Sequence, residues 1–364
     1  TTFETGDGSA YLEQKSGNLV YQVTDAALPG PKFGAVMRRT FNSQSTSKTP
    51  LGYGWDFSFN TTLLRLLDGN GEVIAMLLKD GDGTIHRFDS VAGSPGSYTT
   101  PAGVRMILTE NASGQFSIER FDGVHYEFNK SGQLLRMWEN SGDELFFHYD
   151  GRGNLKSVTT KAYETLSDAQ KEQGLEQIRF LYASDLGDPS VIDPPTNDQV
   201  DLLKCILLPG QQSFENEEQL DSHDYGIKYI YEKDTMNRDR LDKTITYQSK
   251  YDVATDAISS DPASTHRQIY DYTYDTSQAQ NPLGGLIIKD GMNNAHTCTF
   301  TEGRISRVVF PNGEAMDISY APESGGLFTT NTILRTSSAV TPDNIIGTLI
   351  TKTNAQGNPL IKID

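Results

Sequence analysis

The chain has 364 residues and a formal net charge of −17 at pH 7. Nucleic-acid binding needs a basic surface, so this charge disfavours that class of function. No apolar run approaches the length of about 18 residues that a membrane-spanning helix needs, so the chain is not expected to span a membrane. Hydrophobic content is only 36%, yet 17 Tyr, 16 Phe and 33 Gly are present, a balance that favours β-structure over helix bundles.

Residues 1–60 are predicted to form a leading segment of strands that are interrupted by proline. Pro29, Pro31 and Pro50 mark the interruptions, because proline has no backbone N–H to donate within a sheet. The most basic stretch of the segment is Met37-Arg-Arg39. Its two arginines are predicted either to be solvated or to lie on an edge strand, where their charge would prevent pairing with another chain.

Residues 61–160 are predicted to be a meander of strands and turns that contains the clearest repeat. An aromatic pair, a turn and a Gly-x-Leu sequence recur with a spacing of 21 residues, first as Tyr126, Phe128, Gly132 and Leu134, then as Phe147, Tyr149, Gly153 and Leu155. A period of this order indicates stacked supersecondary units. Residues i and i+2 of a strand share a face, so each unit predicts a β-hairpin whose aromatic pair packs in the core. Leu134 and Leu155 then begin the return strands.

Residues 161–225 interrupt this pattern. Ser167 and Gln170 form a capping box, and helix formers continue up to Gly174, which predicts one short surface helix near residues 166–174. Residues 185–200 and 211–225 are acidic and are predicted to be long loops, either functional or disordered.

Residues 226–364 are predicted to return to strands with looser copies of the repeat and one further loop at 256–266. Aromatic pairs recur as Tyr229 with Tyr231 and as Tyr272 with Tyr274. Three dipeptides are typical of two-residue hairpin turns: Asp122-Gly123, Asp290-Gly291 and Asn312-Gly313. The predicted fold class is therefore all-β, with the four segments joined in one continuous winding sheet of hairpins.

The sequence offers no constellation of residues that is typical of catalysis, so we predict no catalytic, cofactor-binding or metal-ligating residue. The six His (86, 125, 148, 223, 266 and 296) lack metal-ligand spacing, and His125 and His148 are expected to face outward together. Asp80 and Asp82 resemble the start of a calcium loop whose later ligands are missing, so a hairpin turn is predicted there.

The two cysteines, Cys205 and Cys298, are predicted to be buried thiols, although a disulfide between them stays open.

Several motifs together resemble the Rhs/YD-repeat family. The series Gly17-Asn-Leu19, Thr24-Asp25, Leu28-Pro-Gly30, Arg39-Thr-Phe-Asn-Ser43 and Gly52-Tyr-Gly-Trp55 resembles the region that leads into its repeats. Tyr149-Asp-Gly-Arg-Gly-Asn-Leu155 resembles the YD repeat itself, and Pro311-Asn-Gly313 resembles the turn between repeats. The resemblance runs from about residue 17 to the end of the chain.

This resemblance implies a non-enzymatic part of a hollow β-shell. Such a shell encloses or presents a C-terminal toxin, or serves as a scaffold that is secreted or lies on the bacterial cell surface. The implied partners are the rest of the shell and its toxin cargo. Shells of this family often end in a self-cleaving Asp-Pro-x-Gly segment, but the Asp-Pro pairs at 188, 193 and 261 lack the x-Gly part. The chain therefore resembles the first part of a shell.

Two other classes of function stay open from the residues alone. The first is an extracellular recognition module for glycans or proteins, in which Trp55 and Trp138 would stack on sugar rings. The second is a hydrolase that uses scattered carboxylates, which no spacing supports. Direct glycan binding would separate a recognition module from a shell.

Overall fold

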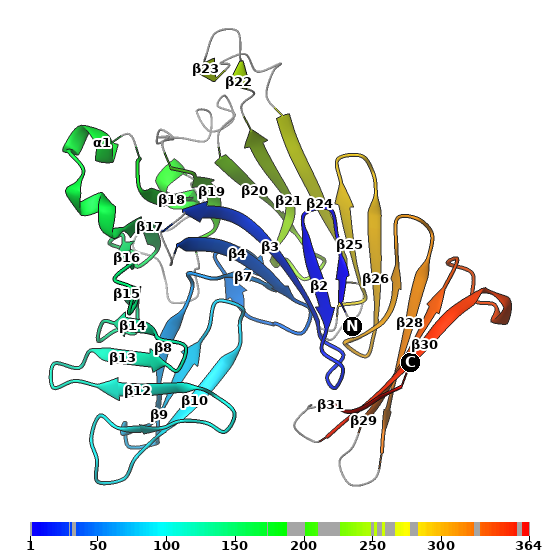
Figure 1. Ribbon diagram of the computed structural model, residues 1–364, viewed down its shortest axis with the longest axis horizontal. Helices are drawn as coiled ribbons and strands as arrows, with labels where there is room; N and C mark the ends of the chain where they lie inside the picture. The colour runs from blue at the N-terminus through cyan, green and yellow to red at the C-terminus, as the bar shows by residue number, and fades with distance from the viewer. Residues whose placement is uncertain are drawn as a thin grey trace.

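The structure is a computed structural model that describes residues 2–28, 30, 34–172, 174–187, 201–209, 226–248, 251–252, 257–258, 266–276, 283–323, 328–354 and 359–363. Its main feature is a single antiparallel sheet of 18 strands that curves into an arch (Figure 1). The strands follow one another in chain order, as expected for repeated hairpins. The predicted all-β fold class is confirmed, and the winding sheet of hairpins is found from Met106 onward.

The large sheet begins at Met106, and the residues before it form separate sheets. Its strands are β12 (Met106–Glu110), β13 (Phe116–Arg120), β14 (Val124–Phe128), β15 (Leu134–Glu139), β16 (Glu144–Tyr149), β17 (Leu155–Thr160), β18 (Gln177–Tyr182), β19 (Leu203–Leu207), β20 (Gly226–Lys233), β21 (Asp239–Gln248), β24 (His266–Asp275), β25 (Gly285–Asp290), β26 (Ala295–Thr301), β27 (Arg304–Val309), β28 (Ala315–Pro322), β29 (Phe328–Arg335), β30 (Ile345–Thr353) and β31 (Pro359–Ile363). A small ribbon of β22 (Tyr251–Asp252) and β23 (Ala257–Ile258) stands beside it.

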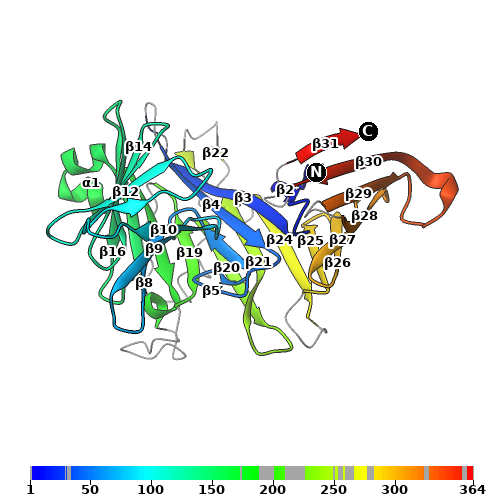
Figure 2. The same ribbon diagram turned by 90° about the horizontal axis from the view of Figure 1, so that it is seen from below.

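An N-terminal sheet of five strands lies inside the arch. Its order is β1 (Thr2–Glu4), β2 (Gly8–Leu12), β3 (Leu19–Leu28), β4 (Ala35–Asn42) and β7 (Trp55–Phe57), and the ribbon of β5 (Lys48–Thr49) and β6 (Gly52–Tyr53) precedes β7. Seen from below, these strands cross the middle strands of the large sheet (Figure 2). We call the side of the large sheet that meets the N-terminal sheet its inner face, and the opposite side its outer face.

A third sheet of four strands completes the layers: β8 (Thr62–Leu67), β9 (Val73–Lys79), β10 (Ile85–Ser90) and β11 (Tyr98–Thr99). The Leu63 N–H donates to the carbonyl of Gly132 over 2.9 Å, which joins β8 to the turn between β14 and β15. Lys79 Nζ lies 2.5 Å from Asp56 Oδ2, which joins β9 to β7. These two contacts fasten the third sheet to the large sheet and to the N-terminal sheet.

One turn recurs along the chain and explains the regular hairpins. The first residue is Asp or Asn, and its side-chain oxygen accepts the backbone N–H groups of the third and fifth residues over 2.8–3.0 Å. The fourth residue has positive φ and is Gly or Asn, the residue types that tolerate this conformation. The turns begin at Asp68, Asn111, Asn129, Asp150, Asp234 and Asp290.

The predicted hairpin of the best repeat is confirmed, with Leu134 and Leu155 as the first residues of β15 and β17. The prediction of two-residue turns is wrong in length. At Asp290, for example, four residues separate the strands, and Asn293 rather than Gly291 has positive φ. The reason is that the Asp side chain caps a five-residue turn, which a Gly at the next position does not shorten.

The insertion after β17 contains the predicted short helix. A 3₁₀ turn, η1 (Lys161–Thr165), precedes α1 (Asp168–Glu172), and Ser167 and Gln170 cap each other as expected. A second 3₁₀ turn, η2 (Ala183–Leu186), covers Leu181, Cys205 and Leu207 on the outer face. A third, η5 (Pro342–Asn344), leads into β30.

The predicted acidic loops fall mostly on residues 188–200 and 210–225, outside the described part of the chain. The same holds for most of the loop that was predicted at 256–266.

Candidate functional site

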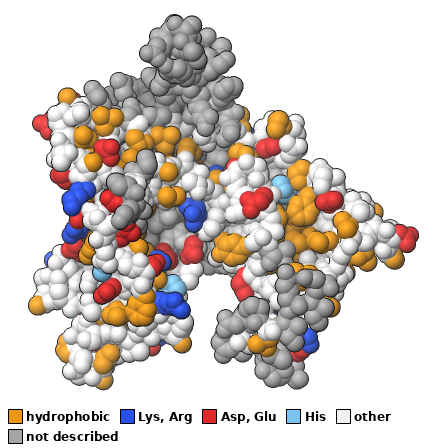
Figure 3. Space-filling view, viewed as in Figure 1, with side chains coloured by type: hydrophobic (Ala, Val, Ile, Leu, Met, Phe, Trp, Pro, Cys, Tyr) orange, Lys and Arg blue, Asp and Glu red, His pale blue; other side chains and the backbone are white. Residues whose placement is uncertain are grey.

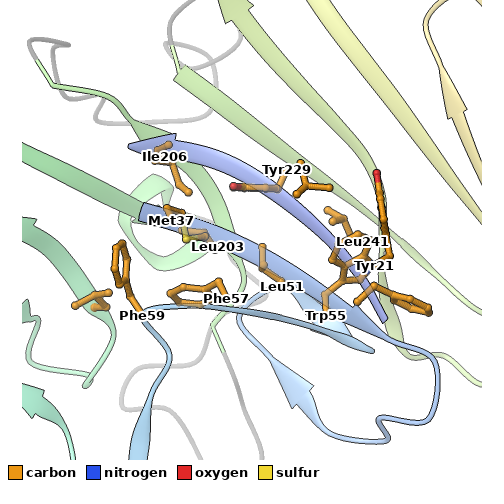
Figure 4. Packing of buried hydrophobic residues seen from close by; sticks show 14 of the residues in the cluster. Tyr21, Met37, Leu51, Trp55, Phe57, Phe59, Leu203, Ile206, Tyr229 and Leu241 are labelled. Carbon is orange, nitrogen blue, oxygen red and sulfur yellow. The ribbon is translucent and has the colours of Figure 1, made fainter. Parts of the chain in front are cut away.

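The interface between the N-terminal sheet and the inner face of the large sheet concentrates the buried functional groups of the described chain. Its apolar part contains Trp55 and Phe57 from β7 and Tyr21 from β3, which face Leu203, Tyr229 and Leu241 of the large sheet (Figure 4). The Trp55 ring lies 5.1 Å from that of Tyr272, and the Phe57 ring lies 6.0 Å from that of Phe180. Alternating apolar residues on β3 and β4 make this face, as strand geometry requires.

A buried ionic cluster lies within this apolar interface. We call it the Arg39 cluster; its members are Asp7, Tyr21, Asp25, Arg39, Tyr229 and Tyr272. Arg39 is only 2% exposed and occupies a core-facing position of β4 between Met37 and Phe41. Its Nε donates to both carboxylate oxygens of Asp25 over 2.8 and 2.7 Å. The guanidinium also lies 5.2 Å from the Trp55 ring, so its charge is balanced by an ion pair and an aromatic face.

Tyrosine hydroxyls from the large sheet complete the Arg39 cluster. Tyr229 donates to Asp25 Oδ2 over 2.6 Å, and Arg39 Nη1 donates to the Tyr272 hydroxyl over 2.9 Å. Tyr272 donates in turn to Asp7 over 3.3 Å, and Tyr21 donates to the same carboxylate. The bonds made by Tyr229 and Tyr272 link residues 204 to 265 positions apart in the chain, and they therefore fix how the two sheets lie on each other.

Burial sets the ionisation of this cluster. It raises the pKa of Asp25 above its usual value, although Arg39 and the Tyr229 hydroxyl act in the opposite direction. Burial also works against the charge of Arg39, but Asp25 and the facing tyrosines raise its pKa well above the usual range. Arg39 Nε contacts both oxygens of Asp25, the geometry of a guanidinium with a carboxylate, and removal of either charge leaves the other without compensation.

A second cluster, the Arg240 cluster, holds the ribbon of β5 and β6 and is made of Tyr53, Asp234, Arg238, Arg240 and Tyr274. Asp234 accepts Arg238 Nε over 2.8 Å and Arg240 Nε over 3.1 Å. Arg240 Nη1 donates to the carbonyl of Tyr53 over 3.1 Å, and its guanidinium lies 5.5 Å from the Tyr274 ring. Burial pushes the pKa of Asp234 upward, but the hydrogen bonds that this carboxylate accepts outweigh it and hold the pKa below its usual value.

Chemically, these two clusters are suited to holding layers together. Every carboxylate of the Arg39 cluster accepts hydrogen bonds from fixed donors, and the cluster is enclosed by aromatic rings. Its charged groups contact tyrosine hydroxyls of the large sheet. Because the Arg39 cluster holds the N-terminal sheet on the inner face of the large sheet, we also call this cluster the lock between the two sheets.

The sequence analysis missed this lock and misassigned one of its residues. The pair at Met37-Arg-Arg39 was predicted to be solvated or to guard a strand edge, but β4 pairs with β3 and β7 on its two sides, and only Arg38 is exposed. A signal was present, because Arg39 stands in alternation with Met37 and Phe41. An Arg on the apolar face of a strand needs a buried partner.

The other predicted residues are placed as follows. Trp55 is buried, and its Nε1 donates to the Tyr274 hydroxyl over 2.8 Å, so it offers no surface for a sugar. Trp138 is half-buried on the outer face, with its ring 5.1 Å from His125 and 4.6 Å from the Arg136 guanidinium.

The predicted outward pair is found on that same outer face, where His148 bonds Thr159 over 3.0 Å. Asp80 and Asp82 form the predicted hairpin turn.

Three further observations concern metal binding, the two cysteines and membrane-spanning helices. No group of three or more His, Cys, Asp or Glu that could hold a metal ion occurs among them. Cys205 and Cys298 are both free and buried, as predicted, and burial raises the pKa of each thiol to about 12. No helix in the described ranges is long and apolar enough to cross a membrane.

Comparison with known proteins gives partial matches. Residues 14–88 match a family described as a domain of unknown function (DUF6531), so the match covers β3 to β9 and most of the lock on the N-terminal side. Over 148 residues, or 40% of this chain, the sequence is 31% identical to the tRNA3(Ser)-specific nuclease WapA of Bacillus spizizenii and 30% identical to the tRNA nuclease WapA of Bacillus subtilis strain 168. The match spans only 6% of the length of each relative.

Among solved structures, the N-terminal domain of effector protein SpvB from Salmonella typhimurium strain LT2 aligns with 91% of this chain and with all of that chain. The sequence identity is 10% and the TM-score is 0.22, which is too low to indicate a shared fold.

Proposed function

We propose that this chain is a non-enzymatic wall segment of an Rhs/YD-repeat shell, which encloses or presents a toxin that lies further along the same polypeptide. The observation that carries the proposal is the 18-stranded arch whose inner face is fastened to the N-terminal sheet by the Arg39 cluster. A container wall needs a curved, continuous sheet with fixed layers. The recurring turn and the lock provide both.

The partial matches support the class of protein. The relatives are named as tRNA nucleases, and this chain corresponds to a small part of them, so we assign nuclease chemistry to a different part of such a polypeptide. The proposed partners are the rest of the shell and its cargo. A bacterial secreted or cell-surface location belongs to the same proposal through the family resemblance.

The notched outline of the molecule fits a wall segment. Figure 3 shows two arms of the molecule with a hollow between them that opens at the bottom of the view. The arms correspond to β12–β17 with β8–β11 on one side and to β25–β31 on the other. Further strands of the same kind would extend the arch around an enclosed space.

Protease protection tests the container proposal. The full reading frame that contains this chain is expressed, and trypsin is added to the native protein and to a sample in urea. We expect the segment downstream of residue 364 to resist trypsin in the native protein and to be digested once the shell unfolds. Free digestion of that segment in the native protein would exclude enclosure.

A second experiment tests the non-enzymatic part separately. The purified 364-residue chain is incubated with total tRNA, and the RNA is examined on a denaturing gel beside a buffer control. We expect intact tRNA at all times. Cleavage above the control that follows the protein through purification would overturn this part of the proposal.

A further inference from the structure

A surface cleft lies far from the Arg39 cluster, where β10 meets the ends of β12 and β13. Its volume is about 520 Å³, within the range of roughly 300–1,000 Å³ that small-ligand sites occupy. It is lined by His86, Gly103, Val104, Arg105, Met106, Arg120, Phe121 and Asp122. On the face shown in Figure 3, basic, His and hydrophobic side chains adjoin one another at lower left, over this part of the molecule.

The cleft is positively charged, whereas the whole chain carries a net charge of −17. Arg120 is held in place by Asp122, with Nε–Oδ1 and Nη2–Oδ2 distances of 3.2 and 2.7 Å, and by the Tyr126 hydroxyl at 3.0 Å. Each of its Nη atoms keeps one N–H group that these bonds do not use. Within the described part of the chain, no carboxylate forms an ion pair with Arg105. Two guanidinium groups and one carboxylate therefore leave a net positive cleft on a chain of charge −17.

The rim of the cleft also carries exposed apolar surface. The Phe121 side chain is 67% exposed, and its backbone N–H donates to the carbonyl of Arg105 over 3.1 Å, which keeps these two residues side by side. An exposed aromatic residue is thus held by its backbone beside an exposed arginine that forms no ion pair within the described part of the chain.

We propose that this cleft binds a carboxylated sugar, such as a hexuronic acid unit of an acidic glycan. The apolar face of a pyranose ring stacks on an exposed aromatic ring, and a guanidinium binds a carboxylate through two parallel hydrogen bonds. Phe121 would supply the first contact and Arg105 the second, while Arg120 and His86 meet the sugar hydroxyls. The positive charge of the cleft selects an anion, and the open aromatic rim selects a ring over an extended acyl chain.

Calorimetric titration of the purified chain tests this assignment with three ligands. Methyl β-glucuronide is expected to bind with a Kd of about 1 mM. Methyl β-glucoside, which differs only at the carboxylate, should bind at least about tenfold more weakly, because the charged hydrogen bonds are lost. Inorganic phosphate, an anion without a ring, should also bind at least about tenfold more weakly, because it makes no stacking contact.

Three variants assign the binding to this cleft. Arg105→Ala and Phe121→Ala should each weaken glucuronide binding about tenfold, and both side chains are exposed, so the fold should survive. Arg87→Ala is the matched control, since Arg87 is an exposed arginine of the same strand as His86 and pairs with Asp89 instead.

Three results would overturn the proposal: no heat of binding with glucuronide at about ten times the expected Kd, equal binding of glucoside or phosphate, or equal losses in the variant Arg87→Ala.

Discussion

Replacement of Arg39 by Met is the sharpest test of the lock between the two sheets. The change keeps an unbranched side chain of similar length but removes the guanidinium that Asp25 and Tyr272 contact. Asp25 would then be a buried carboxylate with only the Tyr229 hydroxyl as its partner. Breaking a buried ion pair by removal of one partner costs about 3–5 kcal/mol.

An independent limit on this loss comes from protonation. Asp25 can avoid an unpaired buried charge by taking up a proton, which costs about 1.4 kcal/mol per pH unit above its unfolded pKa of about 3.9. At pH 7 this cost is about 4 kcal/mol, and at pH 5 it is about 1.5 kcal/mol. A carboxyl whose pKa is raised in the folded state loses stability as pH rises. The deficit of Arg39→Met should therefore shrink by about 2.5 kcal/mol between pH 7 and pH 5.

Urea unfolding followed by tryptophan fluorescence measures this deficit, because Trp55 lies against the Arg39 guanidinium. The double variant Asp25→Asn with Arg39→Met is the control; it lacks both partners of the Asp25–Arg39 pair, so the part of the loss that comes from Asp25 should no longer depend on pH in this range. A deficit below about 1 kcal/mol for Arg39→Met, or one that is equal at pH 5 and pH 7, would refute the reasoning.

Three further predictions address the turns, the repeat and the second cluster. Gly132→Ala should destabilise the protein more than Gly142→Ala, although both glycines have positive φ, because a Cβ at 132 would lie 1.8 Å from a backbone oxygen of β8 and one at 142 would meet nothing within 4 Å. Equal urea midpoints for the two variants would disprove the contact between β8 and the turn. Leu155→Asp should cost several kcal/mol by burying a carboxylate, whereas Glu172→Ala on the exposed helix should stay within about 0.5 kcal/mol, and similar melting temperatures would contradict the placement of the repeat. Asp234→Asn should lower the free energy of unfolding at pH 7, and this loss should fade as pH drops below about 4. The reason is that a carboxylate whose pKa is lowered in the folded state contributes its full stabilisation only above its unfolded pKa. A loss that is constant with pH would contradict this.

The hairpins could be predicted from the sequence because their determinants are local. The Asp or Asn that caps each turn and the residue with positive φ lie three positions apart, as in Asp150 and Gly153, and the aromatic pairs mark the strands that follow or precede them. The length of the turns was misjudged because the familiar Asp-Gly and Asn-Gly signals describe two-residue turns. At Asp290 the side chain of the first residue stabilises a longer turn, whereas the turns that contain Asp122 and Asn312 begin two residues earlier, at Arg120 and Phe310.

The lock and the cleft could not be predicted because their partners come from distant parts of the chain. Asp25 and Tyr229 are 204 residues apart, and nothing near Asp25 indicates which tyrosine will meet it. The division of the first hundred residues into three separate sheets had the same cause. Only the pairing of strands shows that β11 ends one sheet and β12 begins another.

The long separation of the lock residues has a consequence for synthesis on the ribosome. Arg39 and Tyr272 are 233 residues apart, so at 5–20 residues per second the N-terminal sheet waits roughly 12–47 s for its covering strands. Arg39 can pair with Asp25 at once, since both belong to neighbouring strands of the same sheet, but the rings of Tyr21 and Trp55 stay uncovered. During that interval we expect the nascent chain to recruit holding chaperones, and slow translation through β20–β24 to lengthen its exposure to aggregation.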